Sequence, residues 1–124
     1  MIAFLVIVGA AVGAPTRFMM DQFLRRYIKY PYGILIVNVL GSFVIGLTVA
    51  HLQRGYALYS VASTSQVQAL FAIGFAGAFT TWSTFILDLY LAIELKRYKS
   101  AIANLLLSLI FGLLAVELGI HLVN

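Results

Sequence analysis

The sequence predicts an all-α membrane protein with four transmembrane helices. Its 124 residues are 63% hydrophobic and only 10% charged, and the mean hydropathy of +1.03 is typical of a membrane protein rather than a soluble domain. Four apolar runs lie at about 2–24, 33–52, 67–95 and 101–123. At ~1.5 Å per residue, each run is long enough to cross a hydrocarbon core of ~30 Å. Because these runs occupy nearly the whole chain, we treat residues 1–124 as a single domain.

The first run is expected to be a retained helix. No cationic segment precedes it, it lacks an A-x-A cleavage site, and it is longer than the apolar region of a typical signal peptide.

Basic residues gather at one end of the predicted bundle. The two connections at that end carry six Lys or Arg residues, whereas the connection at the other end carries one. Because basic loops usually stay in the cytoplasm, we expect both termini to lie outside. We therefore expect a multi-pass protein of the cell inner (plasma) membrane. The six residues are Arg25, Arg26, Lys29, Lys96, Arg97 and Lys99, and the single one is Arg54.

Composition argues against several functional classes. The chain has no cysteine, which excludes disulfides, thiolate metal sites and cysteine nucleophiles. No long basic stripe is available to neutralise a nucleic-acid backbone. No nucleophile, base and oxyanion donors converge in the sequence, so an enzyme is not expected.

The third run is longer than a membrane requires. Its 29 residues would extend about 43 Å as one helix. The stretch GFAGAFTTWSTF (74–85) places glycines and hydroxyl residues near the middle of this run. Glycine permits a change of backbone direction, and hydroxyls can satisfy the backbone groups that are freed. We therefore expect two half-helices that meet near Gly77 to Thr80, inside the protein or beside an aqueous cavity.

Polar side chains within the spans are functional candidates because they are costly to place in a membrane. Asn38 carries two N–H donors, and few buried partners for them are apparent in the sequence. On the fourth run, Asn104, Ser108 and Gly112 share one helical face. A role in a pore or ligand site and a role in helix packing both remain open for these residues.

Arg17 and Asp88 are expected at similar depth. Each lies eight residues before a basic connection, or about 12 Å along a helix. A buried pair between them is geometrically allowed. It would either fix the first span against the third or attract anions.

Two aromatic residues accompany hydroxyl donors after the expected break. Trp82 and Phe85 are three residues apart on one helical face, with Ser83 and Thr84 between them. Hydroxyls and positive ring edges can replace part of the water shell of a small anion without trapping it. Ordinary packing is the more frequent explanation for such an aromatic pair, so both interpretations stay open on chemistry alone.

Three motifs together resemble a known family. They are GFAGAFTTWSTF (74–85), PYGILIVNVLGSFVIG (31–46) and GAPTRF (13–18). In combination they resemble the small four-helix fluoride channels of the Fluc, or CrcB, family over essentially the whole chain. The resemblance implies an antiparallel two-fold dimer with two fluoride pores at the subunit interface, which exports fluoride passively and selectively.

The resemblance also implies roles for individual residues. Trp82 and Phe85 would occupy the two positions of a phenylalanine box, with Trp82 in place of the usual first phenylalanine. The pathway would comprise Asn38, Trp82, Ser83, Thr84, Phe85 and Ser108, with Asn104 where a tyrosine is frequent.

A structural sodium ion is implied as well. It would lie at the centre of the dimer and bind backbone carbonyls of Gly77 and Thr80. Arg17 would match the arginine of the first helix, and Asp88 replaces a common glutamate.

The identity of the dimer partner stays open. Unequal loop charges favour one fixed orientation, so an identical subunit and a homologous subunit of opposite orientation are both compatible. Two other functions share the four-helix pattern, a small multidrug-type proton-coupled antiporter and a non-transporting membrane scaffold. The antiporter needs a carboxylate within a span, typically the first, and that span has no acid before Asp21.

Overall fold

The computed structural model describes residues 1–28, 32–55 and 65–123. The elements assigned in these ranges are all helical: α1 (Ile2–Tyr27), α2 (Tyr32–Gly55), η1 (Gln68–Ala76), α4 (Gly77–Phe79), α5 (Ser83–Glu94) and α6 (Tyr98–Val123). Four segments are long and apolar enough to span a membrane: Ile2–Tyr27, Tyr32–Arg54, Ser65–Glu94 and Tyr98–Val123. The prediction of an all-helical protein with four membrane-length helices is therefore confirmed. Lys29 and Pro31, which entered the sequence analysis, lie outside the described residues.

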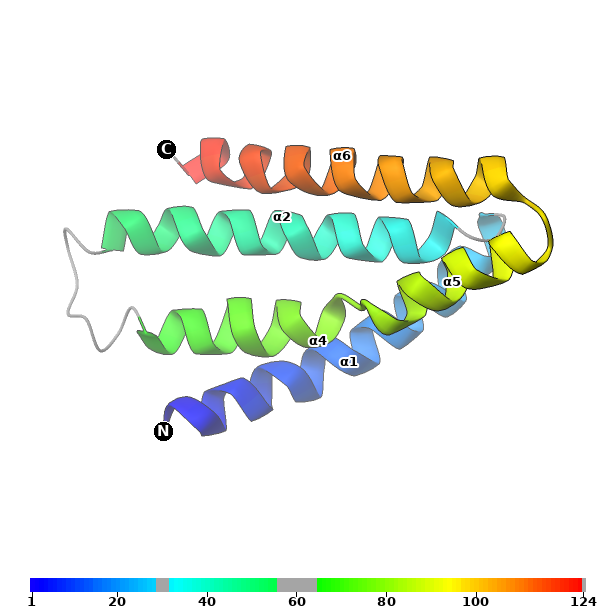
Figure 1. Cartoon of the computed structure of the whole chain (residues 1–124). Coiled ribbons are helices and arrows are strands. Elements are labelled where there is room, and N and C mark those ends of the chain that lie inside the picture. Colours follow the sequence, from blue (N-terminus) through cyan, green and yellow to red (C-terminus); the bar gives the residue numbers. More distant parts are fainter. Residues whose placement is uncertain (29–31, 56–64, 124) are drawn as a thin grey trace.

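The spans pack mainly as two pairs (Figure 1). α2 lies against α6, and α1 lies against η1. Both termini lie at the same end of the molecule, as an even number of spans requires. The turn from α5 to α6 lies at the opposite end, together with the end of α1.

Glycines allow both pairs to approach closely. A Cβ atom at Gly74 of η1 would lie 2.7 Å from the carbonyl oxygen of Val6 and 3.1 Å from Cα of Gly9 on α1. A Cβ atom at Gly119 of α6 would lie 2.7 Å from the carbonyl oxygen of Phe43 on α2. Small residues at such contacts let helix backbones meet, which is how membrane helices gain packing energy.

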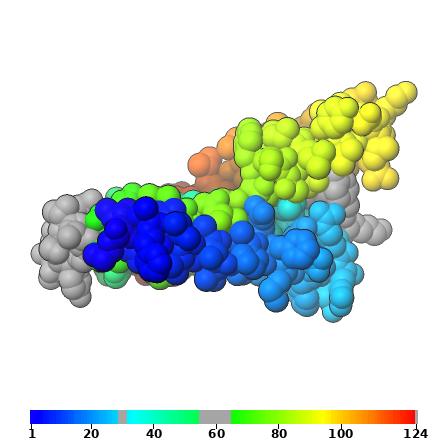
Figure 2. All heavy atoms as spheres, turned by 90° about the horizontal axis from the view of Figure 1, so that it is seen from below, coloured from blue at the N-terminus to red at the C-terminus, as the bar shows by residue number. Residues whose placement is uncertain are grey.

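The third span changes its backbone geometry along its length. η1 is a π-helix that continues into the single turn of α4. After Phe79 the chain becomes extended at Thr80, with φ −77° and ψ 156°, and α5 begins at Ser83. α5 then runs at an angle to η1 and α4 (Figure 1). In Figure 2, α5 and its turn into α6 consequently project away from α1.

The outer surfaces of α1 and α6 are strongly apolar. Only 11% of the most apolar window of each helix is buried within the chain. Phe4 and Ile7 on α1, and Leu113 and Leu118 on α6, are more than half exposed. Such surfaces need lipid or another protein to cover them.

Candidate functional site

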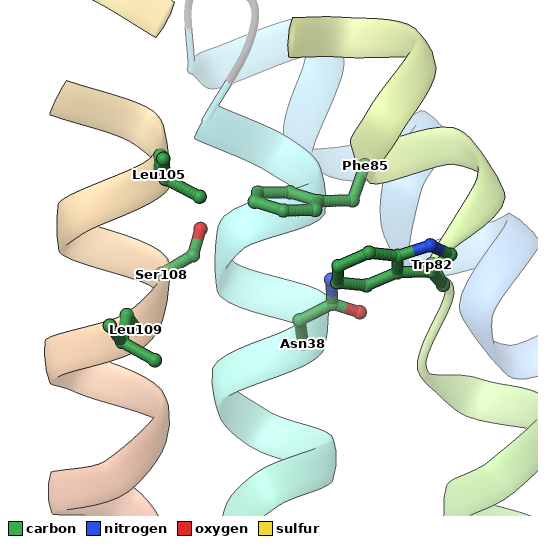
Figure 3. Close-up of a pocket in the computed structure, with 6 residues that line it drawn as sticks. All are labelled: Asn38, Trp82, Phe85, Leu105, Ser108 and Leu109. Atoms are coloured by element: carbon green, nitrogen blue, oxygen red, sulfur yellow. The ribbon is translucent and has the colours of Figure 1, made fainter. Parts of the chain in front are cut away.

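A cavity of about 290 Å³ lies where α2, α5 and α6 meet (Figure 3). Its lining is mostly apolar. The polar groups among the lining residues are the amide of Asn38, the hydroxyl of Ser108 and the indole N–H of Trp82. The structure therefore brings together four residues that the sequence analysis selected on three separate segments. The complete lining is Asn38, Trp82, Phe85, Leu105, Ser108 and Leu109.

Asn38 is tied to the interruption of the third span. Its Nδ2 donates to the carbonyl oxygen of Thr81 at 3.1 Å, and its Oδ1 accepts from the backbone N–H of Thr81 at 2.9 Å. The extended backbone at Thr80 removes Thr81 from the regular helical ladder, so the carboxamide supplies the missing partners. The sequence suggested few partners for Asn38, whereas in the structure Thr81 bonds both the Nδ2 and the Oδ1 of its amide. One Nδ2 hydrogen remains for another acceptor.

Thr81 organises the start of α5. Its Oγ1 accepts from the backbone N–H of Thr84 at 3.3 Å and donates to Thr84 Oγ1 at 3.2 Å. Ser83 Oγ lies 3.4 Å from Thr81 Oγ1. Thr81 lies one residue before Trp82, the N-cap residue of α5, and its hydroxyl supplies an acceptor for a backbone N–H of the first turn, which has no partner within the helix. Sequence reasoning did not include Thr81 in the candidate site, although a threonine close to an expected helix start is a signal for such a contact.

The two candidate aromatic residues have different environments. The ring centroids of Trp82 and Phe85 are 5.9 Å apart and the rings are tilted by 46°. Phe85 is 5% exposed, whereas Trp82 is 75% exposed. Figure 3 shows the Phe85 ring reaching toward Leu105 and Ser108, with the indole of Trp82 beside Asn38. Phe85 is therefore part of the packed chain, and Trp82 lies on its surface.

Two polar residues of α6 are linked to each other. Ser108 Oγ donates to Asn104 Oδ1 at 3.4 Å. Asn104 is fully buried and does not line the cavity. Its Nδ2 has no hydrogen-bond partner among the described residues. Ser108 thus faces the cavity, whereas Asn104 is buried among the helices and does not reach the cavity.

Asp88 and Arg17 lie on different helices. Asp88 on α5 is 3% exposed, and Arg17 on α1 is half-buried. The pairing of these two residues stays a prediction.

Gly77 and Thr80 lie at the end of the first helical part of the third span. The N–H and Oγ1 of Thr80 both donate to the carbonyl oxygen of Ala76, at 2.9 and 2.8 Å. The regular helix stops at Phe79, so the carbonyl groups of the last turn have no following turn to bond. Carbonyl oxygens of this kind are suitable ligands for a small hard cation.

Nearly the whole chain matches a family model. Residues 4–120 match the model described as "CrcB-like protein, Camphor Resistance (CrcB)". A protein of Parabacteroides distasonis named "Fluoride-specific ion channel FluC" is 39% identical over 123 residues, which cover 94% of this chain and 88% of that protein.

More distant relatives carry the same name. A FluC protein of Francisella philomiragia subsp. philomiragia is 37% identical over 118 residues, covering 94% of this chain and 90% of the relative. The "Fluoride-specific ion channel FluC 1" of Methanosarcina acetivorans is 32% identical over 113 residues, covering 90% of this chain and 82% of the relative. With a match to the family model over nearly its full length and relatives above 30% identity, the chain belongs to the CrcB family of membrane proteins.

Proposed function

We propose that this protein is a fluoride-selective ion channel of the cell membrane, through which fluoride leaves the cell passively. The observation that carries the proposal is the agreement between the relatives, which are named fluoride-specific channels, and the cavity beside Asn38. The protein is a channel and not an enzyme. Family membership also disfavours the antiporter and the inert scaffold.

The cavity has the chemistry that a small anion needs. The free N–H of Asn38 can donate a hydrogen bond in place of water, and the Ser108 hydroxyl can do so when it turns away from Asn104 Oδ1. Ser83 and Thr84 do not line the cavity of the single chain, and we propose that their hydroxyls serve the anion farther along the path. The edges of Trp82 and Phe85 add weak positive contacts. Because none of these groups carries a full positive charge, the anion is bound weakly enough to leave. Asn104 contributes by holding Ser108 on the cavity side.

An antiparallel dimer completes this pathway. Its support is the surface position of Trp82, whose indole N–H would be costly to leave against lipid at membrane depth. A second subunit, identical or homologous, covers Trp82 and the exposed part of α6 that borders the cavity at Leu109. The fluoride pathways then lie at the contact between the subunits.

A structural sodium ion fits the end of α4. The carbonyl groups of Gly77 and Thr80 are the proposed ligands, because the helix that would have used such groups ends there. Gly77 is exposed in the single chain, so a ligand from a second subunit has access to it. When bound there, sodium would supply a fixed positive charge that carbonyl groups of Gly77 and Thr80 could share with a second subunit.

Arg17 and Asp88 are proposed as a supporting pair. Asp88 is buried within α5, so a cation on α1 is a suitable counter-charge. The pair would keep α5 at its angle to the rest of the chain.

Fluoride efflux from liposomes that contain only this purified chain tests the function. A fluoride electrode should record rapid release of fluoride, whereas chloride release from matched liposomes should stay at the protein-free rate. Rapid release also establishes that identical subunits are sufficient. If well-folded protein releases no fluoride, co-reconstitution with a homologous subunit from the same cell separates a required partner from a failed proposal.

A further inference from the structure

The turn from α5 to α6 forms a basic hollow. Lys96, Arg97, Tyr98, Lys99 and Ser100 surround a space of about 570 Å³. All three basic side chains are exposed. Neither of the ion pairs Asp21–Arg25 and Glu117–His121 involves Lys96, Arg97 or Lys99. Glu94, the nearest acid in sequence, does not line the hollow.

The backbone of the turn presents these charges in a defined arrangement. Arg97 N–H donates to Ala92 O at 2.7 Å, and Lys96 N–H donates to Ile93 O at 2.9 Å. These two bonds form a Schellman motif, which closes α5. Lys96 has a φ of 57° and is the one non-glycine residue with positive φ in the described part of the chain. A lysine here places a charge where glycine would fit the backbone better.

An apolar groove adjoins the basic hollow. It has a volume of about 180 Å³ and is lined by Leu89, Ile93, Tyr98, Ala101, Ile102 and Leu105. Tyr98 lines both spaces. Ile93 is 50% exposed and Ile102 is 58% exposed, so the groove is open along the outer surface of α5 and α6. In Figure 2 this part of the chain projects from the rest.

We propose that the turn between α5 and α6 binds an anionic phospholipid. The phosphate headgroup lies against Lys96, Arg97 and Lys99, and an acyl chain lies along Ile93, Tyr98 and Ile102. The charge of the hollow complements a phosphate, and the groove begins where an acyl chain would enter the hydrocarbon core. A free phosphate would use the hollow and leave the groove unused, so the groove distinguishes the lipid from other sources of phosphate.

Native mass spectrometry of the intact detergent-solubilised protein tests this proposal. The probes are palmitoyl-oleoyl phosphatidylglycerol, the zwitterionic phosphatidylethanolamine with the same chains, and glycerol 3-phosphate as the headgroup alone. We expect phosphatidylglycerol occupancy at least threefold above that of phosphatidylethanolamine. Glycerol 3-phosphate at the same concentration should not displace the bound phosphatidylglycerol.

Three variants locate the site. Lys96→Gly removes a charge, and glycine suits the left-handed backbone at this position. A loss of bound lipid in this variant would therefore not result from a disrupted turn. Arg97→Gln and Lys99→Gln remove the other charges. Each variant should lower phosphatidylglycerol occupancy at least threefold. Arg26→Gln is the matched control, because it removes an exposed charge from the same end of the molecule and should leave occupancy unchanged.

Defined results would overturn the proposal. The turn is not a specific lipid site if the two lipids have equal occupancy, or if Lys96→Gly and Arg97→Gln keep full phosphatidylglycerol occupancy. The same conclusion follows if Arg26→Gln loses as much phosphatidylglycerol as the variants of the turn. Displacement by glycerol 3-phosphate would show that the acyl groove is not used. None of these readouts involves fluoride, so the outcome is independent of channel function.

Discussion

The side chain of Asn38 on α2 bonds both backbone groups of Thr81, 43 residues later in the chain. A primary amide has the same donor and acceptor as a peptide group, so Asn38 replaces the helical neighbours that Thr81 lost. The interruption of the third span is therefore stabilised by a different helix. The same contact places Asn38 beside the cavity and next to the aromatic pair.

Asn38→Ala should impair stability and conduction together. It leaves the N–H and C=O of Thr81 without these partners, which costs about 1–3 kcal/mol for each group that stays buried. Fluoride efflux should fall roughly tenfold or more, because a hydrogen bond to the ion is lost as well. Thermal unfolding in detergent and liposome efflux measure the two effects.

Ser42→Ala is the control for Asn38. Ser42 lies one turn away on the same helix and is half-buried. Loss of the Ser42 hydroxyl should change the unfolding temperature and the fluoride efflux little. Normal efflux in Asn38→Ala with a lowered unfolding temperature would assign Asn38 a structural role alone.

Phe85→Ile should strongly reduce fluoride flux. Phe85 is 5% exposed and its ring borders the cavity, so isoleucine removes the ring edge and changes the shape of the wall. The free energy of unfolding should fall by only about 1–3 kcal/mol, because isoleucine keeps most of the apolar volume and leaves a small cavity. Phe111→Ile, at an aromatic residue that is 47% exposed on α6, is the matched control. Unchanged efflux from an intact Phe85→Ile dimer would remove Phe85 from the pathway.

Trp82→Phe should raise fluoride flux with little effect on the fold of the subunit. Trp82 is 75% exposed in the single chain, so its replacement disturbs few contacts within that chain. The smaller ring widens the path beside Asn38. Efflux and the fluoride-to-chloride ratio should be measured in parallel. A lower flux would indicate that the indole assists conduction.

Gly41→Ala should disturb the interruption from the side of α2. The added Cβ would collide with the side-chain methyl of Thr80 and lie 3.3 Å from the Phe79 ring. We expect a loss of about 1–3 kcal/mol in the free energy of unfolding, together with reduced efflux.

Gly112→Ala is the counterpart on α6. Its Cβ would lie 3.6 Å from Ser42 Oγ, which is an ordinary contact. Thermal unfolding should distinguish the two glycines. Equal effects would show that close packing on Thr80 is not the reason for glycine at position 41.

Removal of sodium should loosen the dimer. Exchange of sodium for N-methylglucamine withdraws the cation proposed to bind carbonyls of Gly77 and Thr80. The dimer fraction, measured by cross-linking over a dilution series, should fall and recover when sodium returns. A dimer that is indifferent to sodium at every dilution would argue against the central cation site.

The four spans follow directly from the sequence. Apolar length and hydropathy are local quantities, and a bilayer demands about the same length from every helix. The polar candidates were also recognisable, because Asn38 and Ser108 are unusual within otherwise apolar runs. The resemblance of three motifs to the CrcB family then placed them in one functional context, and the family assignment is confirmed.

Other properties depend on contacts between distant segments. The π-helical geometry of η1 has no marker that we recognised in the sequence, and the partner of Asn38 is on another span. Trp82 and Phe85 are both aromatic and lie three residues apart in one segment, yet Trp82 is exposed and Phe85 is buried. Asn104 and Ser108 share a helical face, but only Ser108 reaches the cavity.

The sequence by itself thus determined the environment of the protein, its number of spans and the polar and aromatic side chains that are candidates for an anion path. Hydrophobicity and side-chain chemistry belong to each residue wherever it lies. Tertiary structure alone decided which of these groups meet, which hydrogen bonds they use among themselves and which donor remains free. The direction of α5 after Thr80 sets that arrangement, because it brings Phe85 between α2 and α6 and leaves Trp82 on the surface.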